Sequence, residues 1–275
     1  MSSISPGSVV WFEIGTAGTA AVQDFYGPLL GWAFETDHDS STDGRVYTRI
    51  IAPGAPWPMG AIEQGGTGGE VINLSVLSAD VHDDVERLTK LGATVLVPPT
   101  AVGDVTVFAR LRDPLGNAFA LFSRTTSQQL EERAASTEEH IEQAAYAPAP
   151  GSFAWFEIGT TDPQATREFY EAAFGWRFEK DDSAGGKPYF NVFTGNPFPS
   201  GGMYDHSTGP GGADYVMPSF LVTDVPATVT EATAAGAAVE HGPDGNPDGL
   251  VFARLKDPHG NRFGLFSMPA PPAQG

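Results

Sequence analysis

Each half of the chain opens with a segment in which apolar side chains surround a single glutamate, a pattern that predicts a β-strand with one polar face. These segments, residues 9–15 and 153–159, are rich in aromatic and β-branched residues. The apolar spacing then lengthens to that of a helix, because Phe169, Tyr170 and Phe174 fall on one side of a helical turn in the second half. Each half therefore begins with a strand and a helix, and the aromatic residues at helical spacing are predicted to be core.

Capping residues predict where these helices begin and end. Asp162 is a favourable N-cap and Pro163 suits the first helical turn, while Gly31 and Gly175 suit the C′ position. The tryptophan after each glycine is predicted to close the helix onto the sheet. Further strands are predicted around 46–51, 59–63, 71–77, 105–111 and 118–123, and around 189–194, 202–205, 215–222, 250–255 and 262–267, with helices from Asp80 to Gly92 and from Asp224 to Gly236. Each half is thus built twice from the order strand, helix, strand, strand, strand.

The two halves are copies of one another. Residues 11–35 and 155–179 are identical at 13 of 25 positions, and residues 107–123 and 251–267 at 13 of 17. The offset is 144 residues in both blocks, which indicates duplication of a whole domain rather than a short solenoid repeat. A residue that the chemistry requires in both copies should therefore occur in both.

Composition and turn signals predict the domain boundaries. We expect a first domain at 7–124, a linker at 125–150, a second domain at 151–269 and a tail at 270–275. The linker is polar and acidic, contains helix-forming residues and ends in alternating prolines. In each domain an Asp-Pro-x-Gly-Asn sequence joins the last two strands, with proline pre-setting a turn and glycine or asparagine taking positive φ.

The module order, the Phe-Tyr pair before Gly-Trp and the closing Asp-Pro-x-Gly-Asn hairpin together resemble the vicinal oxygen chelate superfamily. That superfamily includes glyoxalase I, bleomycin-resistance proteins and extradiol dioxygenases. The tandem halves that open with Trp-Phe-Glu-Ile-Gly-Thr are similar to a two-domain actinobacterial group within it. The resemblance implies an α+β fold of two tandem domains. In each domain, two paired βαβββ modules form an open, curved mixed β-sheet around a pocket.

Metal-using members of the superfamily take one ligand from the first strand of each module and a glutamate from a last strand. The resemblance places these positions on Trp11, near Asn73 and on Ala120 in the first half, and on Trp155, near Met217 and on Gly264 in the second. Divalent transition metals need three or more histidine or carboxylate ligands at one point, so we expect no metal and no cofactor in either half. None of the six histidines recurs at the 144-residue offset.

The glutamate of the first strand is the main candidate for chemistry. Strand alternation places Trp11 and Glu13 on one face, and Trp155 and Glu157 likewise. Two roles fit these glutamates: a carboxylate that accepts ligand hydrogen bonds or acts as a general base, or a partner in an ion pair with the arginine of a facing strand, Arg110 or Arg254. Glu13 and Glu157 are the only catalytic candidates. The predicted ligand-binding residues are Trp11, Glu13, Tyr47, Asn73, Arg110, Trp155, Glu157, Tyr189, Met217 and Arg254.

Charge and composition narrow the possible partners. The formal charge of −19 disfavours nucleic acid and anionic membranes, and the absence of cysteine excludes disulfides, thiolate zinc sites and a cysteine nucleophile. The N-terminus lacks the pattern of a signal peptide, and no apolar run reaches the length of a membrane span. We therefore expect a cytoplasmic protein that is a monomer with an internal pseudo-dimer, or a weak homo-oligomer.

Three functions fit these observations. The favoured one is a metal-free small-molecule-binding protein of the bleomycin-resistance kind, which holds an apolar or aromatic ligand in sheet-lined pockets. The alternative is a lyase, isomerase or hydroxylase-like enzyme that uses Glu13, Glu157 or an atypical metal site. A third function is a protein-interaction scaffold. The resemblance does not choose among them, since one fold hosts both binders and enzymes.

Overall fold

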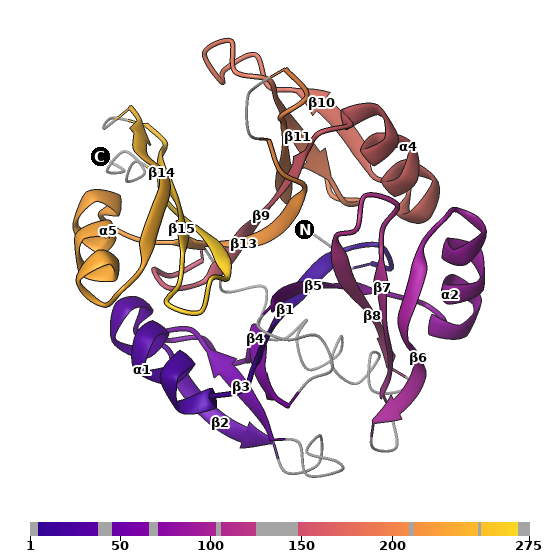
Figure 1. Cartoon of the computed structure of the whole chain (residues 1–275), viewed down its shortest axis with the longest axis horizontal. Helices are drawn as coiled ribbons and strands as arrows, with labels where there is room; N and C mark the ends of the chain where they lie inside the picture. Colours follow the sequence, from indigo (N-terminus) through magenta and orange to yellow (C-terminus); the bar gives the residue numbers. More distant parts are fainter. Residues whose placement is uncertain are drawn as a thin grey trace, which may run out of the picture.

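The computed structural model describes residues 5–37, 46–65, 71–102, 106–124, 148–208, 212–246 and 249–268. Within them the chain forms two eight-stranded sheets with the same strand order, β2-β3-β4-β1-β5-β8-β7-β6 and β10-β11-β12-β9-β13-β16-β15-β14 (Figure 1). Both sheets are mixed, because β1 pairs with β5 in antiparallel and with β4 in parallel fashion. The predicted α+β fold of two tandem domains is confirmed.

Each half repeats the module of strand, helix and three strands. The first half comprises β1 (Val9–Thr16), α1 (Thr19–Leu30), β2 (Ala33–Asp37), β3 (Tyr47–Ile51), β4 (Gly60–Gln64), β5 (Val71–Leu77), α2 (Val81–Lys90), β6 (Thr94–Val102), β7 (Thr106–Arg112) and β8 (Ala118–Arg124). The second comprises β9 (Phe153–Thr160), α4 (Pro163–Phe174), β10 (Arg177–Lys180), β11 (Tyr189–Phe193), β12 (Gly201–Asp205), β13 (Tyr215–Leu221), α5 (Val225–Ala234), β14 (Ala238–Gly245), β15 (Val251–Lys256) and β16 (Arg262–Ser267).

The predicted helix caps are present. The side chain of Asp162 accepts a hydrogen bond from the backbone N–H of Ala165, and Asp80 and Asp224 cap α2 and α5 in the same way. Gly31 ends α1 in the left-handed conformation, with φ of 68°. The helix boundaries therefore follow from local sequence.

The sequence patterns located none of the four edge strands, β2, β6, β10 and β14. Of these, β6 and β14 contain proline and pair with β7 and β15 through interrupted registers. Proline is tolerated on an edge strand because its missing N–H faces away from the ladder. The edge position of β6 and β14 therefore explains how these segments form strands although they contain proline. The predicted linker helix falls on residues 125–147, outside the described residues.

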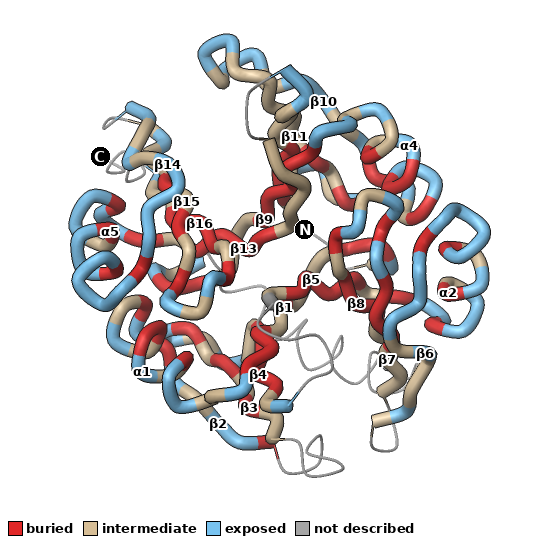
Figure 2. Tube along the Cα trace, in the orientation of Figure 1, coloured by how far each residue is buried: buried red, intermediate tan, exposed pale blue. Residues whose placement is uncertain are grey.

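The helices cover one face of each sheet, and no helix of the described residues lies on the other face, which is called the bare face below. In Figure 1, α1 and α2 lie on the outer side of the first sheet, and α4 and α5 lie on the outer side of the second. The burial pattern in Figure 2 agrees, because the sides of the helices that face the sheets are buried and their outer sides are exposed. Phe12 and Ile14 point to the helix-covered face and are fully buried.

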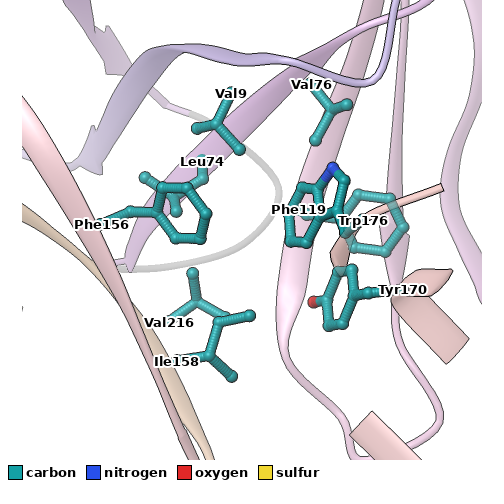
Figure 3. Close-up of a pocket in the computed structure, with 9 residues that line it drawn as sticks. All are labelled: Val9, Leu74, Val76, Phe119, Phe156, Ile158, Tyr170, Trp176 and Val216. Carbon is teal, nitrogen blue, oxygen red and sulfur yellow. The ribbon is translucent and has the colours of Figure 1, made fainter. Parts of the chain in front are cut away.

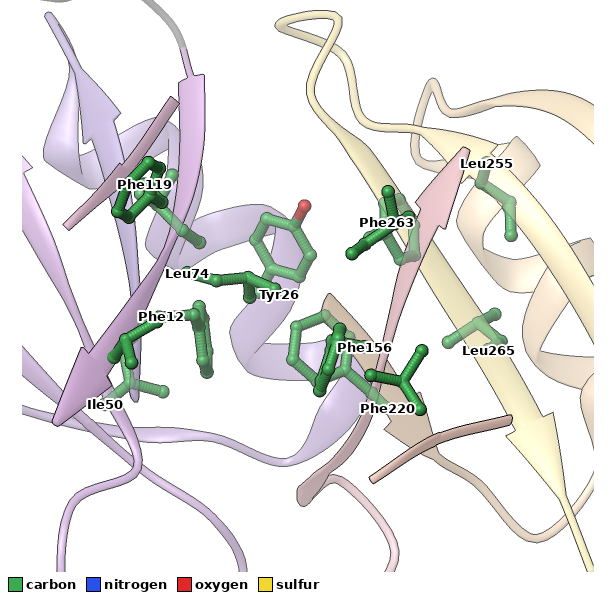
Figure 4. Packing of buried hydrophobic residues seen from close by; sticks show 14 of the residues in the cluster. Phe12, Tyr26, Ile50, Leu74, Phe119, Phe156, Phe220, Leu255, Phe263 and Leu265 are labelled. Carbon is green, nitrogen blue, oxygen red and sulfur yellow. The ribbon is translucent and has the colours of Figure 1, made fainter. Parts of the chain in front are cut away.

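The two halves share one apolar core, because the first helix of each half also packs against the other half. Tyr26 of α1 stacks on Trp32 with ring centroids 5.0 Å apart and meets Phe263 of the second half edge-on at 5.4 Å. Figure 4 shows Tyr26 between side chains of the two halves. Tyr170 of α4 stacks on Trp176 in the same manner, at 4.7 Å. The predicted core role of these aromatic residues is confirmed.

The Asp-Pro-x-Gly-Asn turns add hydrogen bonds to the contact between the two halves. Asp257 accepts hydrogen bonds from Asn261 within its own turn and, at 3.1 Å, from the hydroxyl of Tyr26 in the other half. Asp113 and Tyr170 form the reciprocal pair, also at 3.1 Å. Burial raises the pKa of Tyr26 well above its ordinary value, and the Asp257 carboxylate adds to this effect, so the phenol remains a hydrogen-bond donor.

Trp32 and Trp176 form further hydrogen bonds between the two halves, in each case to a backbone carbonyl. The indole N–H of Trp32 donates to the carbonyl of Gly151 in the second half, and that of Trp176 donates to the carbonyl of Gly7 in the first, each at 2.7 Å. Both indoles are buried, so each N–H needs a partner. The partner comes from the opposite half in both cases.

Replacing Tyr26 or Tyr170 by phenylalanine should weaken the junction of the two halves without altering the packing of the rings. Each change removes a buried hydrogen bond to a carboxylate, so we expect each to lower the free energy of unfolding by about 1.5–3 kcal/mol, measured by urea denaturation. Tyr204→Phe is the control, because the Tyr204 hydroxyl has no hydrogen-bond partner among the described residues. A Tyr26→Phe/Tyr170→Phe double variant as stable as the parent chain would contradict this account.

Candidate functional site

The bare face of each sheet carries a cluster of charged and aromatic side chains. Strand alternation places Trp11 and Glu13 on this face, opposite the fully buried Phe12 and Ile14. The register of β1 with β5 sets Asn73 directly beside Glu13. Polar groups therefore gather on the one sheet face that the apolar core does not use.

In the first half, one arginine holds two carboxylates. Arg110 Nη2 lies 3.0 Å from Glu13 Oε2 and also forms an ion pair with Glu63. The hydroxyl of Tyr47 donates to the other oxygen of Glu13 at 2.8 Å. The three charged side chains are only 8–13% exposed, so the cluster is largely withdrawn from water.

This contact requires a curved sheet. Arg110 lies on β7 and Glu13 on β1, with β5 and β8 between them. Three inter-strand spacings would put the two strands about 14 Å apart on a flat sheet. Arg110 can span them because the bare face is concave. Burial lowers the pKa of Arg110, but the Glu13 and Glu63 carboxylates outweigh burial and raise it above its ordinary value.

The second half repeats the ion pair with different neighbours. Arg254 Nε donates to Glu157 Oε1 at 2.6 Å, and Arg254 Nη2 donates to Oε2 at 3.0 Å. The hydroxyl of Tyr215 also donates to Oε1, at 2.7 Å. The indole N–H of Trp155 donates to the hydroxyl of Tyr189 at 3.1 Å. Burial raises the pKa of Tyr189 and Tyr215 well above the ordinary tyrosine value, and the Glu157 carboxylate adds to this.

Strand register shows which residues correspond between the halves. Glu63 pairs with Gly15 on the neighbouring strand, and Tyr204 pairs with Gly159 in the same way. Tyr204 therefore replaces the second carboxylate, and the guanidinium of Arg254 lies over its ring at 4.9 Å. His206 follows, with its ring 4.6 Å from that of Tyr204. Burial and then the charge of Arg254 lower the pKa of His206.

The structure gathers the ten predicted binding residues into two clusters of five, one in each half. Each glutamate forms an ion pair with the arginine that was predicted as its partner in the second of its two roles. Four residues of the clusters were missed by the sequence: Glu63, Tyr204, His206 and Tyr215. Period-two alternation along β4 and β12 would have placed the first two on the correct face, but their parallel pairing with β1 and β9 has no local sequence signal.

The residues at the superfamily's metal positions do not fit a metal ion. The strand register corrects the middle position, because Ser75 rather than Asn73 stands in one row with Trp11 and Ala120 across β1, β5 and β8, and none of these three offers a strong ligand. In the second half, any side chain at Gly264 would collide with Ser219. Among the residues that the structure describes, no group of three or more histidine or carboxylate side chains is placed to hold a metal ion.

Two buried polar atoms in the first cluster have no protein partner among the described residues. They are Asn73 Oδ1 and Arg110 Nε. Both residues are more than nine-tenths buried, and both lie on the bare face beside Glu13. Leaving such atoms unsatisfied is unfavourable by about 1–3 kcal/mol each, so unpartnered atoms of this kind call for an explanation.

Two hollows elsewhere in the molecule do not involve these clusters. An apolar cavity of about 10 Å³ lies where β5 and β8 of the first half meet α4 and β9 of the second. Figure 3 shows Phe119, Phe156 and Trp176 around it. This volume would hold at most about one water molecule, so the cavity is a packing gap of the shared core. A wider cleft of about 460 Å³ lies at the surface between α1 and α5.

Comparison with known proteins identifies the family. The model of the glyoxalase-like domain matches residues 11–122 and again residues 155–266. The chain belongs to this family, as two tandem copies. The family membership supports the vicinal oxygen chelate fold that the repeated modules indicated.

Relatives share the two-domain length. CFP32 of Mycobacterium tuberculosis (strain CDC 1551 / Oshkosh), which is provisionally named a glyoxylase, is 28% identical over 98% of both chains. The anthracycline biosynthesis protein DnrV of Streptomyces peucetius is 28% identical over 98% of this chain and 96% of its own. DauV of Streptomyces sp. (strain C5), named in the same way, is 27% identical with the same coverage.

Solved structures share the fold at low identity. The Mn(II)-bound glyoxalase from Novosphingobium aromaticivorans superposes with a TM-score of 0.60 at 14% identity, covering 95% of this chain and 82% of that one. The 2,3-dioxygenase LapB from Pseudomonas sp. KL28 gives 0.58 at 15% identity, covering 99% and 96%. Across the described part of the chain, no helix is both long and apolar enough to cross a membrane.

Removing the arginine should affect the first cluster more than the second. Arg110→Met removes a cation that is paired with two nearly buried carboxylates, whereas Arg254→Met removes one that is paired with a single carboxylate, and a tyrosine hydroxyl still donates to Glu13 and to Glu157 in both cases. Breaking a buried ion pair lowers the free energy of unfolding by about 3–5 kcal/mol, and we expect Arg110→Met at or above this range and Arg254→Met below it. Urea denaturation measures both. Arg177→Met is the control, because its pair with Glu179 is exposed and should contribute little. If Arg110→Met and Arg254→Met lowered the free energy of unfolding equally, the account in which Arg110 pairs with two carboxylates and Arg254 with one would be contradicted.

Proposed function

We propose that the protein binds a small aromatic molecule on the concave face of its sheets and does so without a metal ion. The observation that carries this proposal is the pair of buried, unpartnered atoms in the first cluster, Asn73 Oδ1 and Arg110 Nε. A bound molecule that supplied one donor and one acceptor would satisfy both. Trp11, half-buried on the same face, offers an aromatic surface next to them.

The names of two relatives support an aromatic ligand. DnrV and DauV are named anthracycline biosynthesis proteins, and both align with this chain over nearly its whole length. Anthracyclines are fused-ring quinones, which combine a flat apolar body with a few hydrogen-bonding oxygens. The first cluster offers the matching features of an indole face, a free donor and a free acceptor.

Binding is favoured over catalysis by the state of the two glutamates. Glu157 accepts two hydrogen bonds from Arg254 and one from Tyr215, and Glu13 accepts from Arg110 and Tyr47. Each carboxylate is therefore already engaged on both oxygens and is poorly placed to remove a proton from a ligand. The alternative, a lyase, isomerase or hydroxylase-like enzyme that uses Glu13 or Glu157, would first have to break these contacts.

Removing the indole surfaces should weaken the binding of an aromatic probe. In equilibrium dialysis with 2-(hydroxymethyl)anthraquinone, we expect the Trp11→Ala/Trp155→Ala variant to bind about tenfold more weakly than the parent chain, because an aromatic contact and its buried area are lost. Trp57→Ala is the control, since Trp57 is 60% exposed and lies outside both clusters. Unchanged affinity in the double variant would assign both tryptophans a purely structural role.

Metal analysis tests the other half of the proposal. The purified chain, treated with neither chelator nor added metal, should contain well under one equivalent of zinc, iron, manganese and nickel by mass spectrometry. The same sample should bind the anthraquinone probe equally well before and after dialysis against a chelator. A stoichiometric metal whose removal abolishes binding would refute a metal-free site.

A further inference from the structure

The two clusters arose by duplication, but they differ in whether each buried polar atom has a hydrogen-bond partner within its own cluster. Three corresponding positions have changed: Asn73 in the first half is Met217 in the second, Glu63 is Tyr204, and Val71 is Tyr215. The residue in the second half is larger at all three positions, and at two of them it replaces an amide or a carboxylate by a less polar side chain. The consequence is visible in the hydrogen bonds.

In the second cluster, the polar side chains form hydrogen bonds with one another. Both Arg254 Nε and Nη2 are engaged by Glu157, and Tyr215 donates to the same carboxylate. The ring of Tyr215 lies against Gly159, and the hydroxyl of Tyr189 lies against Gly202, so closely that a side chain at either glycine would collide with them. Met217 is 1% exposed. No buried side-chain polar atom of this cluster lacks a partner among the described residues.

In the first cluster, two buried polar atoms have no hydrogen-bond partner among the described residues. Arg110 uses Nη2 for both carboxylates, which leaves Nε as a donor without an acceptor. Asn73, where the second half has methionine, leaves Oδ1 as an acceptor without a donor. Ala61 occupies the position of Gly202, so Tyr47 does not have the glycine surface on which Tyr189 lies. One donor and one acceptor thus remain to be satisfied on this face.

We propose, resting on the proposed function, that each chain binds one ligand, in the first half only, and that this ligand is an aromatic molecule bearing both a carbonyl and a hydroxyl group. The carbonyl accepts from Arg110 Nε–H, the hydroxyl donates to Asn73 Oδ1, and the ring lies against Trp11. The second cluster is an internally satisfied structural element that has lost ligand binding.

Three matched compounds test the ligand chemistry by equilibrium dialysis. 2-(Hydroxymethyl)anthraquinone has both groups, 2-methylanthraquinone lacks the hydroxyl, and 2-(hydroxymethyl)anthracene lacks the carbonyls. We expect the first to bind with one equivalent per chain and about tenfold more tightly than either of the others, since each of the others leaves one buried atom unsatisfied.

Two variants test the location. In Asn73→Met, which installs the residue that the second half carries at this position, the preference for the hydroxyl should disappear, so that 2-(hydroxymethyl)anthraquinone and 2-methylanthraquinone bind alike. In Tyr215→Phe, which removes a buried hydroxyl from the second cluster, the affinities for all three compounds should stay within about twofold of those of the parent chain. Circular dichroism and thermal melting establish that both variants fold, and the comparison of compounds on the parent chain stands even where a variant does not.

The outcomes separate this inference from the proposed function. Two equivalents bound per chain, a preference for the hydroxyl that survives Asn73→Met, or weakened binding in Tyr215→Phe would overturn the inference and leave aromatic binding intact. Equal binding of all three compounds would do the same. Failure of every compound to bind would overturn the proposed function and the inference together.

Discussion

The reciprocal packing of α1 and α4 determines how the rest of this molecule can be used. Each helix lies between the sheet of its own half and the sheet of the other, and a tyrosine on each donates to a turn aspartate across the junction. This packing buries the apolar faces of both sheets. In the part of the chain that the structure describes, no helix covers the concave faces, and these carry the charged side chains. The duplication therefore stabilises the fold and, through the same contacts, leaves the two charged clusters on the concave faces.

The second module of each half supplies an arginine to the cluster that is built on the first strand of the half. Arg110 and Arg254 each neutralise the glutamate of the first strand, and they reach it because the sheet is curved. A nearly buried ion pair adds little net stability over apolar packing, although removing one partner is strongly unfavourable. The arrangement thus fixes the geometry of each cluster. The two copies then differ at neighbouring positions, and only the first is left with unpartnered polar atoms.

Local signals in the sequence were sufficient for most of the fold. The caps at Asp162 and Gly31 and the aromatic spacing of α4 depend on neighbours within a few residues, so they could be read directly. Strands β6 and β14 could not, because their prolines are compatible with a strand only at a sheet edge, and edge position is decided by strand order. The turn at Asp113 was recognised as a turn, but its hydrogen bond to Tyr170 joins residues 57 positions apart and has no local signature.

The same division holds for the clusters. Period-two alternation in β1 was enough to put Trp11 and Glu13 on one face and to name Arg110 as a partner. Glu63, Tyr204 and Tyr215 enter the clusters through the pairing of β4, β12 and β13 with the first strands, and that pairing is set by the closure of the whole sheet. The sequence by itself determined the duplicated frame, the helix boundaries, the inner strands and the repeated Trp-x-Glu strand, because these depend on short-range periodicity and capping. Only the tertiary structure decided that the first cluster keeps a free donor and a free acceptor while the second does not, because partnership of buried atoms depends on which distant strands become neighbours.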